Sequence, residues 1–194
     1  MQLPILSYGH DILRQPCTEI DATYPHLEKL IDNMWETMYA ARGCGLAAPQ
    51  VNVPVRLFLV DSKGTYQSMG EGHRADYFAP EDTGIVETFI NATIIETSEE
   101  TWIDDEGCLS IPVLTERVER PWSITITYQD RLLQQHTKTF YGATARMIQH
   151  EYDHTEGILY LDYLQPLTRR LLTGKLDKIS KGRVKTRYPM KFVK

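Results

Sequence analysis

The sequence predicts an α+β fold, with antiparallel or mixed β-sheets packed around a central helix and a further helix near the C-terminus. Residues 26–41 repeat apolar side chains at spacings of three and four, which is typical of an amphipathic helix. Residues 123–128 alternate apolar and polar side chains, as a half-exposed strand does. The chain has 194 residues, 42% of them hydrophobic, which is typical of one soluble globular domain. We therefore expect a single domain over residues 1–194.

Prolines and glycines interrupt the first twenty residues, which are therefore expected to be irregular or extended. The helix over 26–41 ends at the glycines Gly43 and Gly45. Runs rich in branched and aromatic residues predict the next strands, which lie at 55–60, 89–95 and 123–128, with a hairpin return from 132.

Two more helices are expected in the C-terminal third, at about 143–155 and 167–181, and each stops before a glycine. The segment Asp61–Thr88 is different, because it is polar, contains four glycines and has no clear periodicity. It is predicted to be a long surface loop or insertion, and loops of that length are often functional.

Charge is distributed unevenly along the chain. Residues 167–194 carry ten Lys or Arg and one acidic residue, whereas the whole chain has a formal net charge of −5. We therefore expect a basic C-terminal helix and tail at about 167–194. Such a region could contact a polyanion such as RNA, or it could simply be a solvated helix end.

Three cysteines and the absence of a basic, apolar leader favour a reducing, cytoplasmic location. No apolar run approaches the roughly 18 residues that span a bilayer, so no membrane partner is expected.

The strongest chemical motif is His150-Glu151-Tyr152-Asp153-His154 on the helix over 143–155. Residues four apart share a helix face, so both imidazoles can point at one metal ion. The intervening Glu151 can reach a metal-bound water as a proton shuttle. Two histidines that meet by chance on a helix are the alternative interpretation.

A catalytic tetrahedral site requires a third protein ligand. The carboxylates downstream of the motif (Glu156, Asp162 and Asp177) are poorly placed for this role, which weakens a zinc-protease interpretation. Cys108, in Glu106-Gly107-Cys108-Leu109-Ser110, is the better candidate. A buried structural cysteine remains the alternative at this position.

A third motif runs from Gly43 to Gln50 with the sequence Gly-Cys-Gly-Leu-Ala-Ala-Pro-Gln. Two glycines followed by small residues permit a ligand to approach the backbone closely. Taken alone, this motif is more typical of a helix end followed by a packed loop.

Together, and in this order, the three motifs make the chain resemble the peptide deformylase family over roughly residues 1–166. The resemblance implies that Cys108, His150 and His154 hold one divalent metal. The native metal would be Fe2+, with Zn2+, Ni2+ or Co2+ as further possibilities. It also implies a substrate, the N-terminal formyl-methionine of nascent polypeptides, and no role in binding DNA.

The same resemblance assigns the other roles. A metal-bound hydroxide would attack the formyl carbon and release formate, with Glu151 as general acid and base. Gln50 and the backbone N–H of Leu109 would stabilise the developing oxyanion, and the backbone of Gly45 would contact the substrate. A +9 tail on an enzyme of nascent chains also suggests ribosome contact.

The substrate pocket is expected on the helix face that carries the ligands. Met147 would suit a methionine side chain, although it could equally be plain core. Cys44 replaces the aliphatic residue that is usual beside Gly45 in the family. Arg146 could pair with Glu106.

Two other functions remain open on the residues alone. One is a metal-dependent amidase or protease of unrelated substrate, and the other is a non-catalytic domain whose metal is structural. A structural site would need a fourth ligand, and neither Cys17 nor Cys44 has helpful spacing.

Overall fold

The computed structural model describes residues 1–193 and has the predicted α+β architecture. The three longer helices agree with the predicted ones: α1 (Leu27–Ala40), α4 (Gly142–Thr155) and α5 (Pro166–Ser180). Short 3-10 turns occur at Asp11–Arg14, Ala48–Val51 and Tyr160–Tyr163. Lys194, the last residue of the predicted basic tail, lies outside the described residues.

The strands form two antiparallel sheets and one separate parallel pair, so the antiparallel part of the prediction is confirmed and no sheet among the described residues is mixed. An antiparallel sheet in the order β2-β3-β4-β7-β8 contains β2 (Gly45–Ala47), β3 (Leu57–Asp61), β4 (Val86–Thr97), β7 (Ser123–Gln129) and β8 (Gln135–Tyr141). A separate antiparallel hairpin is made of β5 (Thr101–Cys108) and β6 (Ile111–Pro121). The parallel pair β1 (Ile5–Leu6) and β9 (Met190–Lys191) joins the two ends of the chain.

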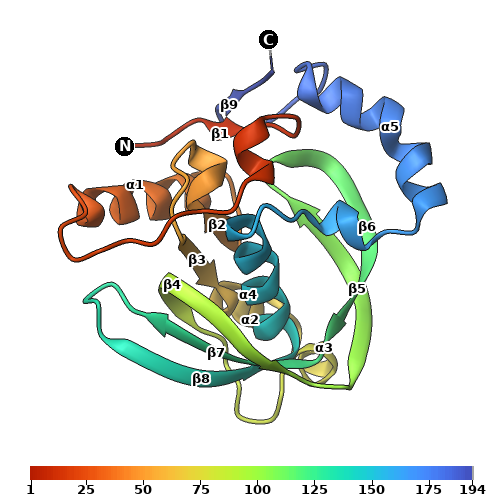
Figure 1. The fold of residues 1–194 in the computed structure, drawn as a ribbon. Helices are drawn as coiled ribbons and strands as arrows, with labels where there is room; N and C mark the ends of the chain where they lie inside the picture. The colour runs from red at the N-terminus through yellow and green to blue at the C-terminus, as the bar shows by residue number, and fades with distance from the viewer. Residues whose placement is uncertain (194) are drawn as a thin grey trace.

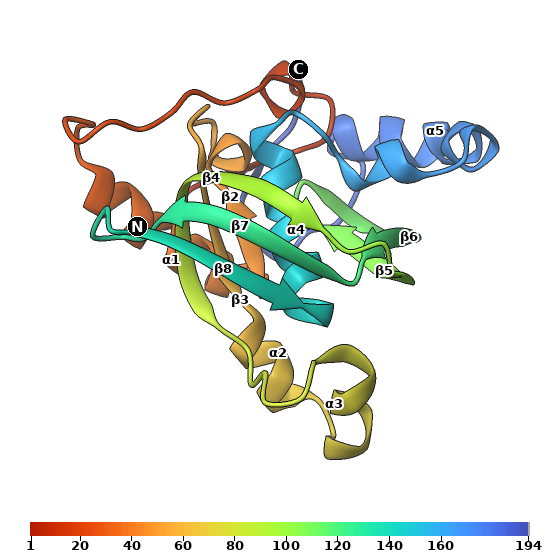
Figure 2. The same ribbon diagram turned by 60° about the horizontal axis from the view of Figure 1, so that its bottom comes forward.

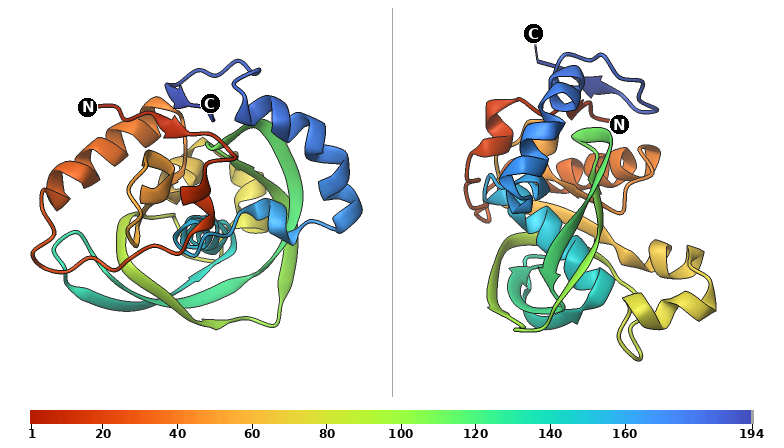
Figure 3. Two further views of the ribbon diagram at one scale, coloured as in Figure 1. Left: turned by 45° about the horizontal axis from the view of Figure 1, so that its top comes forward. Right: turned by 90° about the vertical axis from the view of Figure 1, so that its right-hand side faces the viewer.

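Helix α4 runs through the middle of the molecule, with the five-stranded sheet and the β5–β6 hairpin on different sides of it (Figure 1). A view along α4 shows the strands surrounding it (Figure 3, left). Its apolar side packs on the sheet, where Ala145 and Ile148 meet Phe58, Phe89 and Ile126. The central helix of the prediction is therefore α4.

The prediction of a long loop over Asp61–Thr88 is wrong. The segment folds into two short helices, α2 (Ser62–Ser68) and α3 (Glu71–Tyr77), which protrude from the body (Figure 2). Seven-residue helices are too short to show a periodic apolar face. Asp61 caps the first of them by accepting a hydrogen bond from the Gly64 N–H at 2.7 Å, and the buried Phe78 follows the second.

Within residues 1–193, no helix is both long and apolar enough to cross a membrane.

Candidate metal centre and substrate cleft

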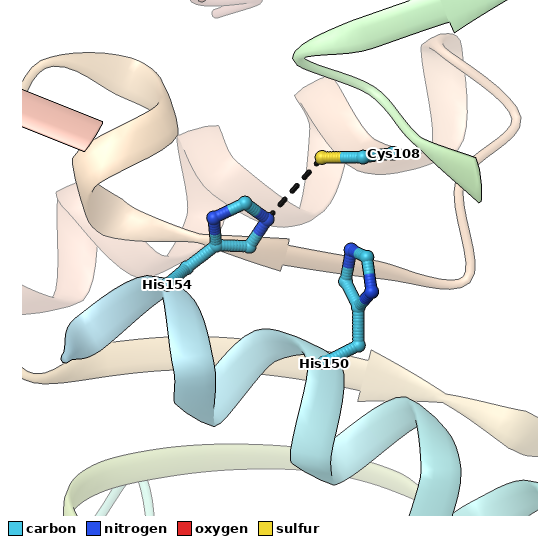
Figure 4. A group of neighbouring side chains, drawn as sticks. All are labelled: Cys108, His150 and His154. Carbon is cyan, nitrogen blue, oxygen red and sulfur yellow. Dashed lines mark hydrogen bonds between the residues drawn. The ribbon is translucent and has the colours of Figure 1, made fainter. Parts of the chain in front are cut away.

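Three side chains predicted as metal ligands converge at the centre of the molecule. One ligand atom from each of Cys108, His150 and His154 lies within 4.8 Å of the other two. The Cys108 Sγ is 3.2 Å from Nε2 of His154, and both imidazoles project from α4 toward the thiol (Figure 4). One thiol and two imidazoles form a donor set that fits a late first-row divalent ion.

Local structure explains this convergence. His150 and His154 are four positions apart on α4, so they lie on one face about one turn apart. Cys108 ends β5, immediately before the two-residue turn Leu109-Ser110 that leads into β6. The β5–β6 hairpin thus places the thiol of Cys108 across from the histidine-bearing face of α4.

Glu106 orients the first histidine. Its carboxylate accepts a hydrogen bond from Nδ1 of His150 at 3.0 Å, which leaves Nε2 of that ring for a metal. Burial raises the pKa of Glu106, but hydrogen bonds from His150 and Arg120 outweigh it and hold the pKa well below its ordinary value. The carboxylate is therefore charged at neutral pH.

Two arginines neutralise this buried carboxylate. Arg120 donates to both Glu106 oxygens at 2.9 Å and to Asp153 at 2.6 Å. Arg146 donates to Glu106 at 2.7 Å, which confirms the predicted pairing, and its guanidinium lies over the Trp102 ring. Arg120 and Asp153 were missed in the sequence, because charged residues far apart in the chain give no local signal of pairing.

The pKa values of the two histidines are shifted in opposite directions. Burial lowers the pKa of His154 well below its ordinary value, so the ring is neutral and its nitrogen is free to bind a metal. Burial also acts to lower the pKa of His150, but hydrogen bonds to Cys108 and Glu106 raise it above its ordinary value.

Glu151 lies beside the candidate ligands with a buried carboxylate. Its Oε2 has no hydrogen-bond partner among the described residues, and burial raises its pKa to about 7. The side chain packs directly against Gly45 of β2. A carboxylate with such a pKa can exchange a proton at neutral pH.

Gln50 also points its amide at the site. Its Oε1 accepts the Ala47 N–H at 2.8 Å, which turns Nε2 toward Cys108 Sγ, 3.5 Å away, and toward Ser110 Oγ, 3.2 Å away. Gln50 is buried, so this orientation is held by its surroundings.

A cleft of about 880 Å³ opens onto Cys108, His150 and Glu151. It is lined by predicted site residues, namely Cys44, Gly45, Cys108, Leu109, Met147, His150 and Glu151. Met147 is both a cleft residue and a neighbour of the core, so each of the two interpretations of it describes part of its surroundings. The α2–α3 segment adds Thr65, Met69 and Tyr77, and residues 185–188 close another part of the wall.

Comparison with known proteins decides the family. The family model described as Polypeptide deformylase matches residues 2–170. The chain belongs to this family. A peptide deformylase of Christiangramia forsetii is 48% identical over 192 residues, which cover 99% of this chain and 96% of that protein. One of Salinibacter ruber is 40% identical over 98% of this chain and 94% of its own length.

Solved structures agree. The crystal structure of peptide deformylase from Ehrlichia chaffeensis has a TM-score of 0.79 and 31% identity, covering 92% of this chain and 96% of its own. A plant peptide deformylase has a TM-score of 0.78 and 31% identity, covering 93% and 90%. As a polypeptide deformylase, the chain is a metal-dependent hydrolase that removes the N-formyl group from nascent peptides.

Proposed function

We propose that this chain hydrolyses the formyl group of N-terminal formyl-methionine with a metal ion held by Cys108, His150 and His154. The observation that carries this proposal is the convergence of the three ligand atoms within 4.8 Å beside the buried carboxylate of Glu151. When bound, the ion would supply Lewis acidity and lower the pKa of a water molecule at the site.

We infer that the native ion is Fe2+. A thiolate with two imidazoles suits late first-row ions, so Zn2+, Ni2+ or Co2+ could replace it. The thiolate would also make the protein sensitive to oxidation, because ligand thiolates are readily converted to sulfenic and higher acids.

Glu151 is the proposed general acid and base. Its carboxylate takes the proton of the attacking water and gives it to the leaving amine, so that formate and a free N-terminal amine are the products. Its pKa of about 7 matches this two-way transfer at neutral pH.

Hydrogen-bond donors stabilise the negative charge that develops on the formyl oxygen in the transition state. The amide of Gln50 and the backbone N–H of Leu109 are the proposed donors. The Ala47 N–H holds Oε1 of Gln50, so the amide N–H groups face the site before the reaction starts. Removing one such donor costs roughly 100- to 1,000-fold in rate in other enzymes.

The substrate is proposed to lie in the cleft along Gly45, with its methionine side chain near Met147 and Cys44. A flexible thioether packs well against another methionine. Gly45 has no side chain to obstruct a peptide backbone.

Replacing Glu151 with Gln tests the mechanism directly. The Glu151→Gln variant should retain one metal per chain and lose formate release from a formyl-methionyl peptide. Glu99→Gln, an exposed change of the same kind, should behave like the wild type. Turnover that survives Glu151→Gln would overturn the assignment of the general base.

We also propose that the basic C-terminal region contacts the ribosome and that the protein acts in the cytoplasm, where nascent chains are made. Helix α5 exposes Arg170, Lys175 and Lys178. Reversing these three charges to Glu should reduce cosedimentation with ribosomes in a salt-dependent way. Equal pelleting of the variant and the wild type would contradict this contact.

A further inference from the structure

The C-terminal segment returns to the substrate cleft after α5. Residues 182–189, here called the strap, lead from the end of α5 to β9. The Ile5 N–H donates to the Pro189 carbonyl and the Ser7 N–H donates to the Lys191 carbonyl, both at 3.0 Å. Figure 1 shows β9 beside β1 at one end of the molecule. The strap is thus fastened to the body on its C-terminal side.

Tyr188 of the strap reaches the Leu109-Ser110 turn, which carries one of the two proposed oxyanion donors. Its hydroxyl donates a hydrogen bond of 2.8 Å to the carbonyl of Leu109, a residue 79 positions earlier. Both side chains pack against the apolar cluster that contains Leu46. Burial raises the pKa of Tyr188 to about 12, so the hydroxyl keeps its proton at neutral pH and remains a donor.

The turn is also held from two other directions. The Tyr8 N–H donates to the Ser110 carbonyl at 2.7 Å, and Gln50 donates to the Ser110 hydroxyl at 3.2 Å. Both of these bonds end on Ser110. Among the residues that the structure describes, Tyr188 is therefore the side chain that holds Leu109 by a hydrogen bond, and Leu109 is the residue whose N–H is proposed to meet the formyl oxygen.

We propose that Tyr188 is a positioning residue for deformylation, which holds the Leu109 carbonyl and thereby restrains the backbone dihedral angles of Leu109, on which the direction of its own N–H donor in the preceding peptide plane depends. This inference rests on the proposed function. A preformed donor stabilises the transition state only when it is aimed within a few tenths of an ångström, and its supporting contacts determine that aim. On this proposal the strap supports the active site through Tyr188, in addition to carrying basic residues.

The Tyr188→Phe variant of the full, metal-loaded enzyme tests this role, because it removes only the hydroxyl. We expect kcat to fall about 5- to 50-fold, while KM stays within about twofold and the metal content and Tm match the wild type. Tyr39→Phe is the matched control: it also loses one hydroxyl hydrogen bond, of 2.9 Å to Asp61, but lies outside the cleft lining. It should leave kcat unchanged.

A second measurement does not depend on turnover. The amide nitrogen of Ser110 follows the Leu109 carbonyl, so its NMR shift should change in Tyr188→Phe and stay constant in Tyr39→Phe. An unchanged kcat, a rise in KM alone, or a loss of kcat that only follows a loss of metal or Tm would each overturn the inference. Failure of the proposed function is distinguishable, because the wild type itself would then release no formate.

Discussion

The Cα of Gly45 on β2 lies against the carboxyl group of Glu151 on α4. A methyl group added at Gly45 would come within 2.7 Å of Cγ and Cδ of Glu151, closer than such atoms approach. The glycine therefore makes room for the proposed general base, in addition to its proposed contact with the substrate.

Gly45→Ala should consequently displace Glu151. We expect kcat/KM for a formyl-methionyl peptide to fall by about 100-fold, since a misplacement of about 1 Å is enough for such a loss. Metal content should remain at one per chain, because the ligands themselves are not touched. Gly174→Ala in α5, where an added methyl meets nothing within 4 Å, should retain full activity. Wild-type activity in Gly45→Ala would contradict the steric argument.

Glu151 should also make stability depend on pH in the metal-free protein. Its pKa is about 7 in the folded chain, against an ordinary value of 4.5. Between these values the folded state holds more protons than the unfolded state, so the free energy of unfolding falls as pH rises. Relative to Glu151→Gln, the wild type should lose up to about 3 kcal/mol between pH 4 and pH 8.

Urea unfolding of both proteins at these two pH values measures this difference. The other titrating groups are common to the two chains and cancel to a first approximation. A gap between wild type and variant that is the same at both pH values would show that Glu151 titrates normally.

Glu106→Gln should weaken metal binding. The carboxylate of Glu106 fixes the ring of His150 through the 3.0 Å hydrogen bond to Nδ1, and loss of such a partner typically lowers affinity by about 10- to 100-fold. Competition with a chelator of known affinity gives the dissociation constant. The exposed Glu119→Gln on β6 should bind metal like the wild type. Equal affinities in all three proteins would count against the orienting role.

Arg120→Met should destabilise the fold strongly. The side chain of Arg120 is 2% exposed, and its removal leaves the carboxylates of Glu106 and Asp153 buried together without their shared cation. Such a change costs about 3–5 kcal/mol. Arg117→Met, an exposed change on the same strand, should alter the free energy of unfolding by less than about 0.5 kcal/mol. Similar values for the two variants would refute a structural role for the cluster.

Periodicity explains which elements could be predicted. The α1 helix shows a regular apolar face, and β7 alternates apolar and polar residues, so both were predicted within a residue or two of their bounds. The β5–β6 hairpin was not predicted as strands. Its sequence is dense in charged residues, and two of them, Glu106 and Arg120, are buried because they pair with each other.

The site shows the same division between local and distant information. His150 and His154 could be predicted to lie together because helix geometry places residues four apart on one face, and Glu151 adjoins His150 in the chain. Tyr188 carries no such signal, since its bond to Leu109 joins residues 79 positions apart and depends on the pairing of β1 with β9. Charge counting could describe residues 167–194 as basic, but it could not place 185–188 in the cleft wall.

The most direct test is formate release from an N-formyl-methionyl peptide by anaerobically purified protein whose metal has been quantified. We expect rapid release by protein that holds one metal per chain, with activity that is lost as air oxidises Fe2+ and Cys108. Rapid release that resists air would retain the reaction and favour zinc or nickel. No release by protein that holds one metal per chain would contradict the proposed function.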